Sequence, residues 1–137
     1  MNYMESHRYL MRFSIRPSVQ RTAIMEYLMN HKTHPTVEEI YMALNPSIPT
    51  LSKTTVYNTL NLFTEKGAVQ VLTIDDKNAR YDANVSNHGH FYCRSCGKVH
   101  DIFNMNPEAY QIPHFEDFVV DTVEISYYGI CKACKGS

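Results

Sequence analysis

The apolar positions in the first half of the chain recur at helical spacing. Over residues 17–31 they lie three or four positions apart, which predicts a helix with one buried face. That face consists of Val19, Ala23, Ile24, Tyr27 and Leu28. A second helix is predicted after Thr36, because Thr36 and Glu39 have the spacing of a capping box and an apolar stripe follows them. Pro46 and Pro49 end this helix and begin a connection.

A third helix is predicted within residues 51–67, with Ser52 as its cap and Gly67 at its end. Its inward face consists of Val56, Leu60 and Phe63. Residues 68–85 contain two extended segments around the turn "DDKN", which predicts a β-hairpin. Three helices followed by a hairpin are typical of a winged helix-turn-helix domain.

The second half of the chain has a different pattern. The segment "VSNHGH" places small and polar residues around a glycine, which is typical of a hinge. Residues 90–103 and 118–131 are rich in β-branched and aromatic residues and are predicted to be strands, with a short helix over 106–111. We therefore expect an α+β protein, with a winged helix-turn-helix domain over residues 1–84 and a small α/β domain over residues 85–137.

Composition bears on the compartment. The chain has 137 residues, of which 44% are hydrophobic and 20% charged, as is usual for a soluble globular protein. The sequence has no apolar stretch long enough for a signal peptide or a membrane span. We therefore expect a cytoplasmic protein with no membrane partner, whose thiols stay reduced.

Four cysteines form two pairs with the spacing CxxC, "CRSC" and "CKAC". In a reducing compartment such pairs predict metal ligands, and four thiolates complete a closed tetrahedral zinc site of the structural kind. The alternatives are a thioredoxin-like redox pair and a disulfide. The predicted zinc ligands are Cys93, Cys96, Cys131 and Cys134.

A second metal site is suggested by residues beside the first cysteine pair. If residues 88–92 form a strand, His88 and His90 point to one side and Cys93 points to the other. With Asp101, the two histidines make a nitrogen and oxygen donor set, which accepts Fe(II), Mn(II) or Zn(II). The alternative is that the histidine pair is only a polar strand face.

The net charge of −1 does not by itself indicate a nucleic-acid partner. Four arginines are nevertheless concentrated in the first 21 residues, at Arg8, Arg12, Arg16 and Arg21. Such a run is also expected of a solvated basic face. The start of the third predicted helix carries Lys53, Thr54 and Thr55, which suit contacts with phosphates or base edges, although such residues can also simply cap a helix.

Taken together, these motifs resemble the ferric uptake regulator superfamily of bacterial metal-responsive transcription factors. The resemblance covers about residues 14–135 and rests on "HPTVEEIY", "TTVYNTLNLF", the HxH–CxxC block and the second CxxC, in the family's order and spacing. It implies a DNA-binding repressor in which residues 1–84 bind DNA and residues 85–137 bind metal and form a homodimer. A two-fold dimer reads a palindrome, here expected to be an A·T-rich double-stranded operator.

Within that family, the chain looks most like the peroxide-responsive branch. Asp101 stands where iron-sensing members commonly have glutamate, and Asn58 stands where they often have arginine. The resemblance implies a regulatory Fe(II) or Mn(II) site with the ligands His34, Asp82, His88, His90 and Asp101. Without the resemblance, His34 would be interpreted as a surface histidine before a helix.

The third predicted helix is expected to enter the major groove of DNA. Tyr57 and Asn58 face away from the core stripe, so that Asn58 can bond adenine and Tyr57 can touch a thymine methyl or a phosphate. By resemblance, Arg16 matches a basic residue that some members place in the minor groove. The expected DNA contacts are Arg16, Lys53, Thr54, Thr55, Tyr57 and Asn58.

Three alternative functions are consistent with parts of the sequence. Two histidines and a carboxylate form the facial triad of non-haem iron oxygenases, although the chain lacks the strands of their β-barrel. A zinc-ribbon module that binds RNA or protein would use the cysteines and ignore a second metal. A regulator of the same family could respond to the availability of iron, manganese or zinc, without sensing peroxide.

Overall fold

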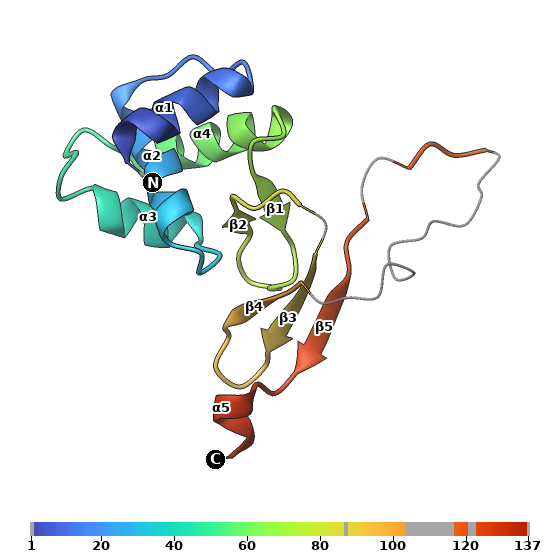
Figure 1. Ribbon diagram of the computed structural model, residues 1–137. Helices are drawn as coiled ribbons and strands as arrows, with labels where there is room; N and C mark the ends of the chain where they lie inside the picture. Colours follow the sequence, from blue (N-terminus) through green and yellow to red (C-terminus); the bar gives the residue numbers. More distant parts are fainter. Residues whose placement is uncertain (1, 87, 104–116, 121–122, 137) are drawn as a thin grey trace. The chain divides into compact units, whose positions relative to one another are not determined.

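The computed structural model describes residues 2–86, 88–103, 117–120 and 123–136. The chain divides into two compact units, which we call the N-terminal unit (residues 1–85) and the C-terminal unit (residues 86–137) (Figure 1). The predicted short helix over 106–111 lies outside the described residues. Among the described residues, none of the helices is both long and apolar enough to cross a membrane.

The N-terminal unit consists of helices followed by a hairpin. The elements are α1 (Tyr3–Arg12), α2 (Val19–Asn30), α3 (Val37–Leu44), α4 (Lys53–Glu65), β1 (Gln70–Leu72) and β2 (Arg80–Asp82). The two strands are antiparallel, with Gln70 opposite Asp82. The three predicted helices and the predicted hairpin are therefore confirmed, and the winged helix-turn-helix order is preceded by one further helix.

Each of these helices begins at a residue whose side chain accepts a backbone N–H from the first turn. The cap residues are Asn2, Ser18, Thr36 and Ser52. The predicted capping box is present in part: Thr36 Oγ1 accepts the Glu39 N–H at 3.2 Å and donates to the Glu39 carboxylate. Capping satisfies N–H groups that have no partner inside the helix, which explains why these helices start where they do.

Helix α1 was missed by the hydrophobic pattern because its inward face is narrow. It buries only Ser6 and Leu10, whereas Met4 and Met11 on the same helix are exposed. The predicted face of α2 also needs one correction. Val19 is 65% exposed, and Met25, which the prediction left out, is fully buried. Val19 directly follows the Ser18 cap, where the backbone is still entering the helix.

The core of the N-terminal unit is drawn from all four helices. It includes Leu10, Ile24, Met25, Leu28, Ile40, Val56, Leu60 and Phe63. Burial of apolar surface on this scale is the main force that holds such a unit together. The core also fixes the orientation of α4, since the stripe of Val56, Leu60 and Phe63 faces inward as predicted.

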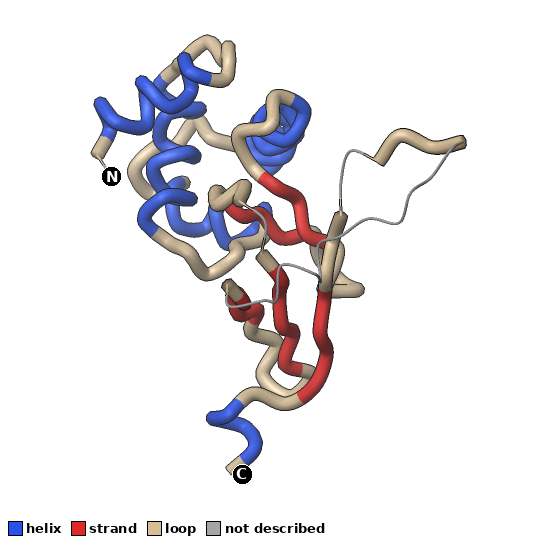
Figure 2. Tube along the Cα trace, turned by 45° about the vertical axis from the view of Figure 1, so that its right-hand side comes forward, coloured by secondary structure: helices blue, strands red, loops and turns tan. Residues whose placement is uncertain are grey.

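The C-terminal unit is a small sheet with a short terminal helix (Figure 2). Its elements are β3 (Gly89–Cys93), β4 (Val99–Ile102), β5 (Ser126–Gly129) and α5 (Lys132–Lys135). Strand β3 lies in the middle, antiparallel to β4 and parallel to β5. The strand predicted over 118–131 is thus shorter than expected: its described part is paired only over β5.

Candidate metal centres and nucleic-acid surface

The four cysteines come together at one end of the C-terminal sheet. Cys93 ends β3, and a tight turn with Gly97 at φ +76° brings Cys96 back beside it. The parallel pairing of β3 and β5 sets Cys93 opposite Gly129, so that Cys131 and Cys134 follow directly at the start of α5. The CxxC pairs therefore meet because of strand register and one glycine turn.

The geometry of the thiol cluster fits a tetrahedral metal site. All four sulfur atoms lie within 4.8 Å of one another, and Cys96 Sγ is 3.8 Å from Cys131 Sγ. Zinc–sulfur bonds of about 2.3 Å at tetrahedral angles require sulfur atoms about 3.8 Å apart. A disulfide would need about 2.05 Å. The cysteines are therefore positioned as metal ligands, and the disulfide alternative does not fit.

The backbone around Cys93 favours a thiolate. The backbone N–H groups of Cys131 and Cys96 each donate to Cys93 Sγ at 3.4 Å. These bonds, the one from Cys131 first, lower the pKa of the Cys93 thiol to about 6. Because the thiolate is the form that binds metal, this sulfur is prepared for a cation at neutral pH.

The histidines of the C-terminal unit converge on one carboxylate. His90 on β3 is the register partner of Asp101 on β4, and its Nε2 is 3.3 Å from Asp101 Oδ1. His88 Nε2 lies 3.0 Å from the same oxygen. His88 Nδ1 is 2.7 Å from the Ser86 carbonyl oxygen, and a proton on Nδ1 that donates to this carbonyl leaves Nε2 as the metal-binding nitrogen.

A second histidine–carboxylate pair lies in the N-terminal unit. His34, between α2 and α3, is 2% exposed, and its Nε2 is 3.6 Å from Asp82 Oδ2 at the end of β2. The interpretation of His34 as a surface histidine is therefore wrong. His34 has φ +57°, a left-handed conformation that costs a residue with a side chain on the order of 1–3 kcal/mol. Backbone strain of this kind is concentrated at functional sites.

The His34–Asp82 pair and the group of His88, His90 and Asp101 both suit a six-coordinate ion of the first transition series. Neighbouring ligands at about 2.1 Å from an octahedral ion lie about 3 Å apart. The nitrogen–oxygen distances are 3.0 and 3.3 Å at Asp101 and 3.6 Å at Asp82. Imidazole and carboxylate donors accept Fe(II), Mn(II) and Zn(II) and lack the thiolate preference of the cysteine cluster.

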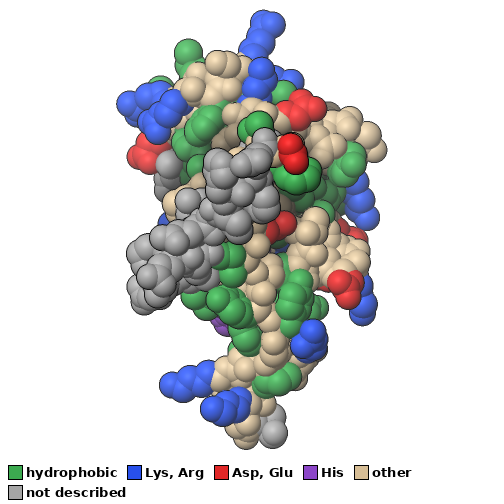
Figure 3. Space-filling model, turned by 90° about the vertical axis from the view of Figure 1, so that its right-hand side faces the viewer, with side chains coloured by type: hydrophobic (Ala, Val, Ile, Leu, Met, Phe, Trp, Pro, Cys, Tyr) green, Lys and Arg blue, Asp and Glu red, His purple; other side chains and the backbone are tan. Residues whose placement is uncertain are grey.

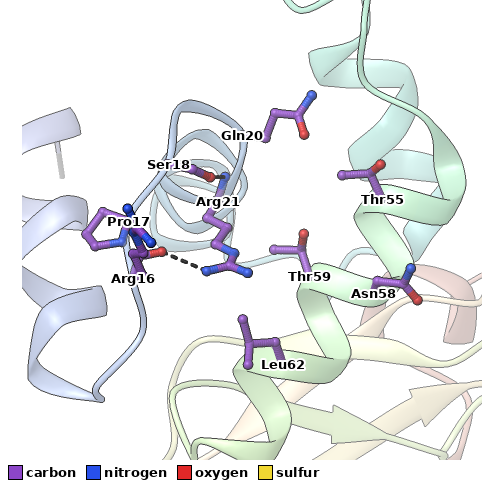
Figure 4. Close-up of a pocket in the computed structure, with 9 residues that line it drawn as sticks. All are labelled: Arg16, Pro17, Ser18, Gln20, Arg21, Thr55, Asn58, Thr59 and Leu62. Atoms are coloured by element: carbon purple, nitrogen blue, oxygen red, sulfur yellow. Dashed lines mark hydrogen bonds between the residues drawn. The ribbon is translucent and has the colours of Figure 1, made fainter.

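A groove of about 630 Å³ lies between the start of α2 and the side of α4 (Figure 4). Its lining residues are Arg16, Pro17, Ser18, Gln20, Arg21, Thr55, Asn58, Thr59 and Leu62. The Arg21 guanidinium donates to the Arg16 carbonyl at 2.8 Å, which ties the two arginines together. Arginines beside a helix N-terminus and an exposed asparagine are groups that bind phosphates and base edges.

Comparison with known proteins gives the family. The chain matches the ferric uptake regulator family over residues 13–128. The chain belongs to this family. It is 41% identical to the peroxide-responsive repressor PerR of Staphylococcus epidermidis over 96% of the chain and 89% of that protein. The PerR of Staphylococcus aureus is 40% identical, with 96% and 90% covered.

Solved structures of ferric uptake regulator relatives have the same fold. The ferric uptake regulator of Helicobacter pylori superposes with a TM-score of 0.74 at 21% identity, over 100% of this chain and 96% of that one. PerR of Streptococcus pyogenes gives 0.54 at 30% identity, with 96% and 92% covered. The chain is therefore a metal-dependent transcription regulator of this family, and the oxygenase and zinc-ribbon alternatives are wrong.

The structure places the expected DNA-contacting residues of this regulator on one side of α4 and beside it. Thr54, Tyr57 and Asn58 are exposed, whereas Thr55 is half-buried. Lys53 Nζ pairs with Glu38 Oε1 at 3.3 Å on the surface. Arg16 is exposed at the groove.

Gln20 and Arg21 line the groove but were not among the predicted DNA contacts. Two signals pointed toward them: Arg21 belongs to the run of arginines in the first 21 residues, and both residues follow the Ser18 cap, where a helix N-terminus attracts anions. Their place opposite α4 depends on how the two helices pack.

Proposed function

We propose that the protein is a cytoplasmic peroxide-responsive repressor, in which one regulatory metal ion binds both histidine–carboxylate groups, five side chains in all. The observation that supports this most strongly is the division of the candidate ligands. His34 and Asp82 belong to the N-terminal unit, and His88, His90 and Asp101 belong to the C-terminal unit. An ion held by all five would tie the two units into one arrangement.

The energy available for such a switch is sufficient. Moving a two-state equilibrium from 1:99 to 99:1 requires about 5.5 kcal/mol of differential binding. Several metal–ligand bonds made in one arrangement and lost in the other supply energies of this order. Each group is already assembled within its own unit, so little side-chain ordering opposes binding.

Fe(II) is proposed as the metal that would make the site responsive to peroxide, because its redox chemistry with hydrogen peroxide would be available there, whereas that of Mn(II) would not be readily. His34 and His88 are the side chains proposed to be oxidised. One oxygen atom of the peroxide is added to a ring carbon, and the other leaves as water. The oxidised ring is a poorer ligand, so the two units are released and the operator is lost.

The thiol cluster is proposed to hold a structural Zn(II). Four thiolates leave no open position on the ion, so this metal would stabilise the fold and take no part in sensing. Zinc and the regulatory ion would therefore have separate roles, which can be measured separately.

DNA binding is assigned to the face of α4 and the groove beside it. Asn58 and Tyr57 would contact bases in the major groove, Lys53, Thr54 and Thr55 would contact bases or phosphates, and Arg16 would reach the minor groove. The operator is proposed to be an A·T-rich palindrome. Because the net charge is −1, binding would depend on local positive charge and weaken steeply with salt.

Homodimerisation is assigned to the C-terminal unit. Hydrophobic side chains reach the surface in the space-filling view (Figure 3). In the C-terminal unit, the exposed apolar residues include Tyr127, Tyr128 and Ile130, at and after β5. Their exposed fractions are 48%, 44% and 51%. Exposed apolar surface of this kind marks protein interfaces, and a second copy reading the other half of a palindrome would cover it.

The experiment is fluorescence anisotropy of a labelled palindromic operator with zinc-loaded protein. The protein is titrated with Mn(II) or Fe(II), before and after hydrogen peroxide. Binding with Fe(II) is expected to collapse after peroxide, while binding with Mn(II) survives. Peptide masses should show one added oxygen on His34 or His88, and a His100→Ala variant, in which an exposed histidine of the same sheet is removed, should behave like wild type.

The main competing function is a regulator of metal availability in the same family. It is favoured by the donor set itself, since nitrogen and oxygen ligands also suit Zn(II) and Mn(II) without any redox step. In that case both metals would support operator binding and peroxide would change neither curve. Absence of added oxygen on both histidines would likewise contradict peroxide sensing.

A further inference from the structure

We infer that Arg80 and Asp75, neither of them a metal ligand, form a positioning pair that holds His34 in its metal-binding conformation. The inference rests on the proposed regulatory site and adds residues that set its affinity. It lies wholly within the N-terminal unit. The observation behind it is a chain of contacts from the hairpin turn to the backbone of His34.

The first contact in this chain is an ion pair with little exposure to solvent. Arg80 Nε and Nη2 each lie 3.1 Å from Asp75 Oδ2, and the two side chains are 14% and 6% exposed. The other carboxylate oxygen, Asp75 Oδ1, accepts the Lys77 backbone N–H at 3.0 Å. Asp75 is thereby fixed to the turn between β1 and β2, and two nitrogens of the Arg80 guanidinium converge on its Oδ2.

The second contact reaches across to the loop before α3. Arg80 Nη1 donates to the His34 carbonyl oxygen at 3.3 Å, over a sequence separation of 46 residues. The Tyr81 backbone N–H donates to the Pro35 carbonyl at 3.0 Å, next to it. Two bonds from β2 therefore hold the two peptide groups that flank Pro35.

One of these two hydrogen bonds is made to His34, whose backbone conformation is unusual. His34 has a positive φ of +57°, in a region that residues with a side chain uncommonly occupy, although histidine does so more often than most, and contacts from its surroundings help to hold it there. Without the bond to its carbonyl, the loop would be free to relax to an ordinary conformation. The imidazole would then move away from Asp82.

Strand geometry links the Arg80 contact with His34 to Asp82, the proposed metal ligand on the same strand. Arg80 and Asp82 are two positions apart on β2, so their side chains leave the same face of the strand. On that face Arg80 contacts the carbonyl of His34, and Asp82 lies 3.6 Å from its ring. Strand β2 thus positions the backbone of His34, through Arg80, and also carries the carboxylate of Asp82.

The arginine is suited to this task in a way that lysine is not. The guanidinium is a rigid fork that can contact Asp75 on one side and the His34 carbonyl on another at the same time. A lysine ammonium is a single point at the end of a flexible chain. Arg80→Lys should therefore keep the positive charge but lose the ability to contact Asp75 and the His34 carbonyl at the same time.

The test measures Mn(II) binding to the zinc-loaded full chain by electron paramagnetic resonance of the free ion, without DNA. Arg80→Lys and Asp75→Asn are each expected to raise the dissociation constant for Mn(II) about 10-fold or more, as is usual for residues that orient metal ligands. Glu38→Gln is the matched control, because it breaks the exposed ion pair with Lys53 in the same unit. It should leave the constant unchanged.

A double-mutant cycle separates positioning from general loosening. In a His34→Ala background, Arg80→Lys and Asp75→Asn should cause no further loss of Mn(II) affinity, because the group they position is gone. Equal losses in both backgrounds would overturn the inference, as would unchanged affinity in the wild-type background. Thermal unfolding and zinc content are measured for every variant, and if Arg80→Lys does not fold, Asp75→Asn decides the outcome.

Failure of the proposed regulatory site would be seen differently. Wild-type protein that takes up no Mn(II) beyond its zinc, or a His34→Ala variant that binds Mn(II) as wild type does, would contradict that site and this inference with it. Normal Mn(II) uptake that depends on His34 but is unaffected by Arg80 and Asp75 would overturn the positioning pair alone.

Discussion

The two units of the chain are stabilised in different ways. Among the described residues, the buried apolar side chains lie almost entirely in the N-terminal unit, and the C-terminal unit contributes only Cys93 and Val99. What the C-terminal unit has instead is a cluster of four thiols at the end of its sheet. One unit is thus organised around an apolar core and the other around a candidate metal site.

The difference shows what each part of the molecule depends on. A small domain with little buried apolar surface usually needs a metal, a disulfide or a partner to stay folded. The C-terminal unit fits this description, and its cysteine distances favour a metal over a disulfide. The N-terminal unit needs no such help, so the two should respond independently to changes in their own stabilising groups.

The largest effect is expected from removing the thiol cluster. Cys93→Ser should abolish zinc binding, for which structural sites supply roughly 10–16 kcal/mol, and the C-terminal unit should unfold. Zinc content and the amide NMR spectrum measure this, and the helical circular dichroism signal of the N-terminal unit should persist. Lys98→Ala, which removes an exposed side chain beside the cluster, is the control. A native amide NMR spectrum of the C-terminal unit in the absence of zinc would contradict the view that this unit depends on a metal for its fold.

A smaller effect is expected from opening a cavity in the apolar core. Phe63 is fully buried on α4, and Phe63→Ala should lower the free energy of unfolding of the N-terminal unit by about 3–5 kcal/mol. Urea denaturation followed by circular dichroism measures the change, with the exposed Asn61→Ala on the same helix as control. The zinc content of the folded variant should match wild type; a parallel loss of zinc would mean that the two units are not independent.

The smallest effect concerns the acid stability of the N-terminal unit. The Lys77 backbone N–H, and with it the Arg80 guanidinium, lowers the pKa of Asp75 below its ordinary value. Between the lowered pKa and the ordinary one, the unfolded chain binds more protons than the folded chain, so stability rises with pH there. The contribution is complete above the ordinary range near pH 3.9 and is lost as the pH falls through the folded pKa.

Urea denaturation of wild type and Asp75→Asn at several pH values checks this sign. The difference in unfolding free energy should be largest near neutral pH and shrink as the solution becomes strongly acidic. Asp76→Asn, an exposed neighbour in the same turn, should show no such trend. A difference that stays constant on acidification would contradict the role assigned to the Asp75 carboxylate.

Features that depend on residues close together in the sequence were predictable. The cap residues Thr36 and Ser52 and the stripe on α4 follow from local spacing, and the structure confirms them. The thiol cluster was also foreseen, because CxxC spacing already places two sulfur atoms on one turn. Val19 was misjudged because periodicity alone does not show where a helix leaves its cap.

Features that depend on distant segments were not predictable in the same way. The contact from Arg80 to the His34 carbonyl joins residues 46 positions apart, and it exists only because the hairpin packs beside the loop before α3. The positive φ of His34 was likewise not predicted, since only a minority of histidines adopt it and the residue type alone does not show which ones do. The groove between α2 and α4 is a product of helix packing.

The parallel pairing of β3 with β5 also governs how quickly the C-terminal unit can assemble. Parallel neighbours cannot be joined by a tight turn, and here Cys93 and Cys96 are separated from Cys131 by more than thirty residues. Closing a loop of that length costs entropy before any contact is gained, which slows folding. We therefore expect the first CxxC turn to bind zinc early, before the second cysteine pair completes the site. The rate of folding should then rise with zinc concentration.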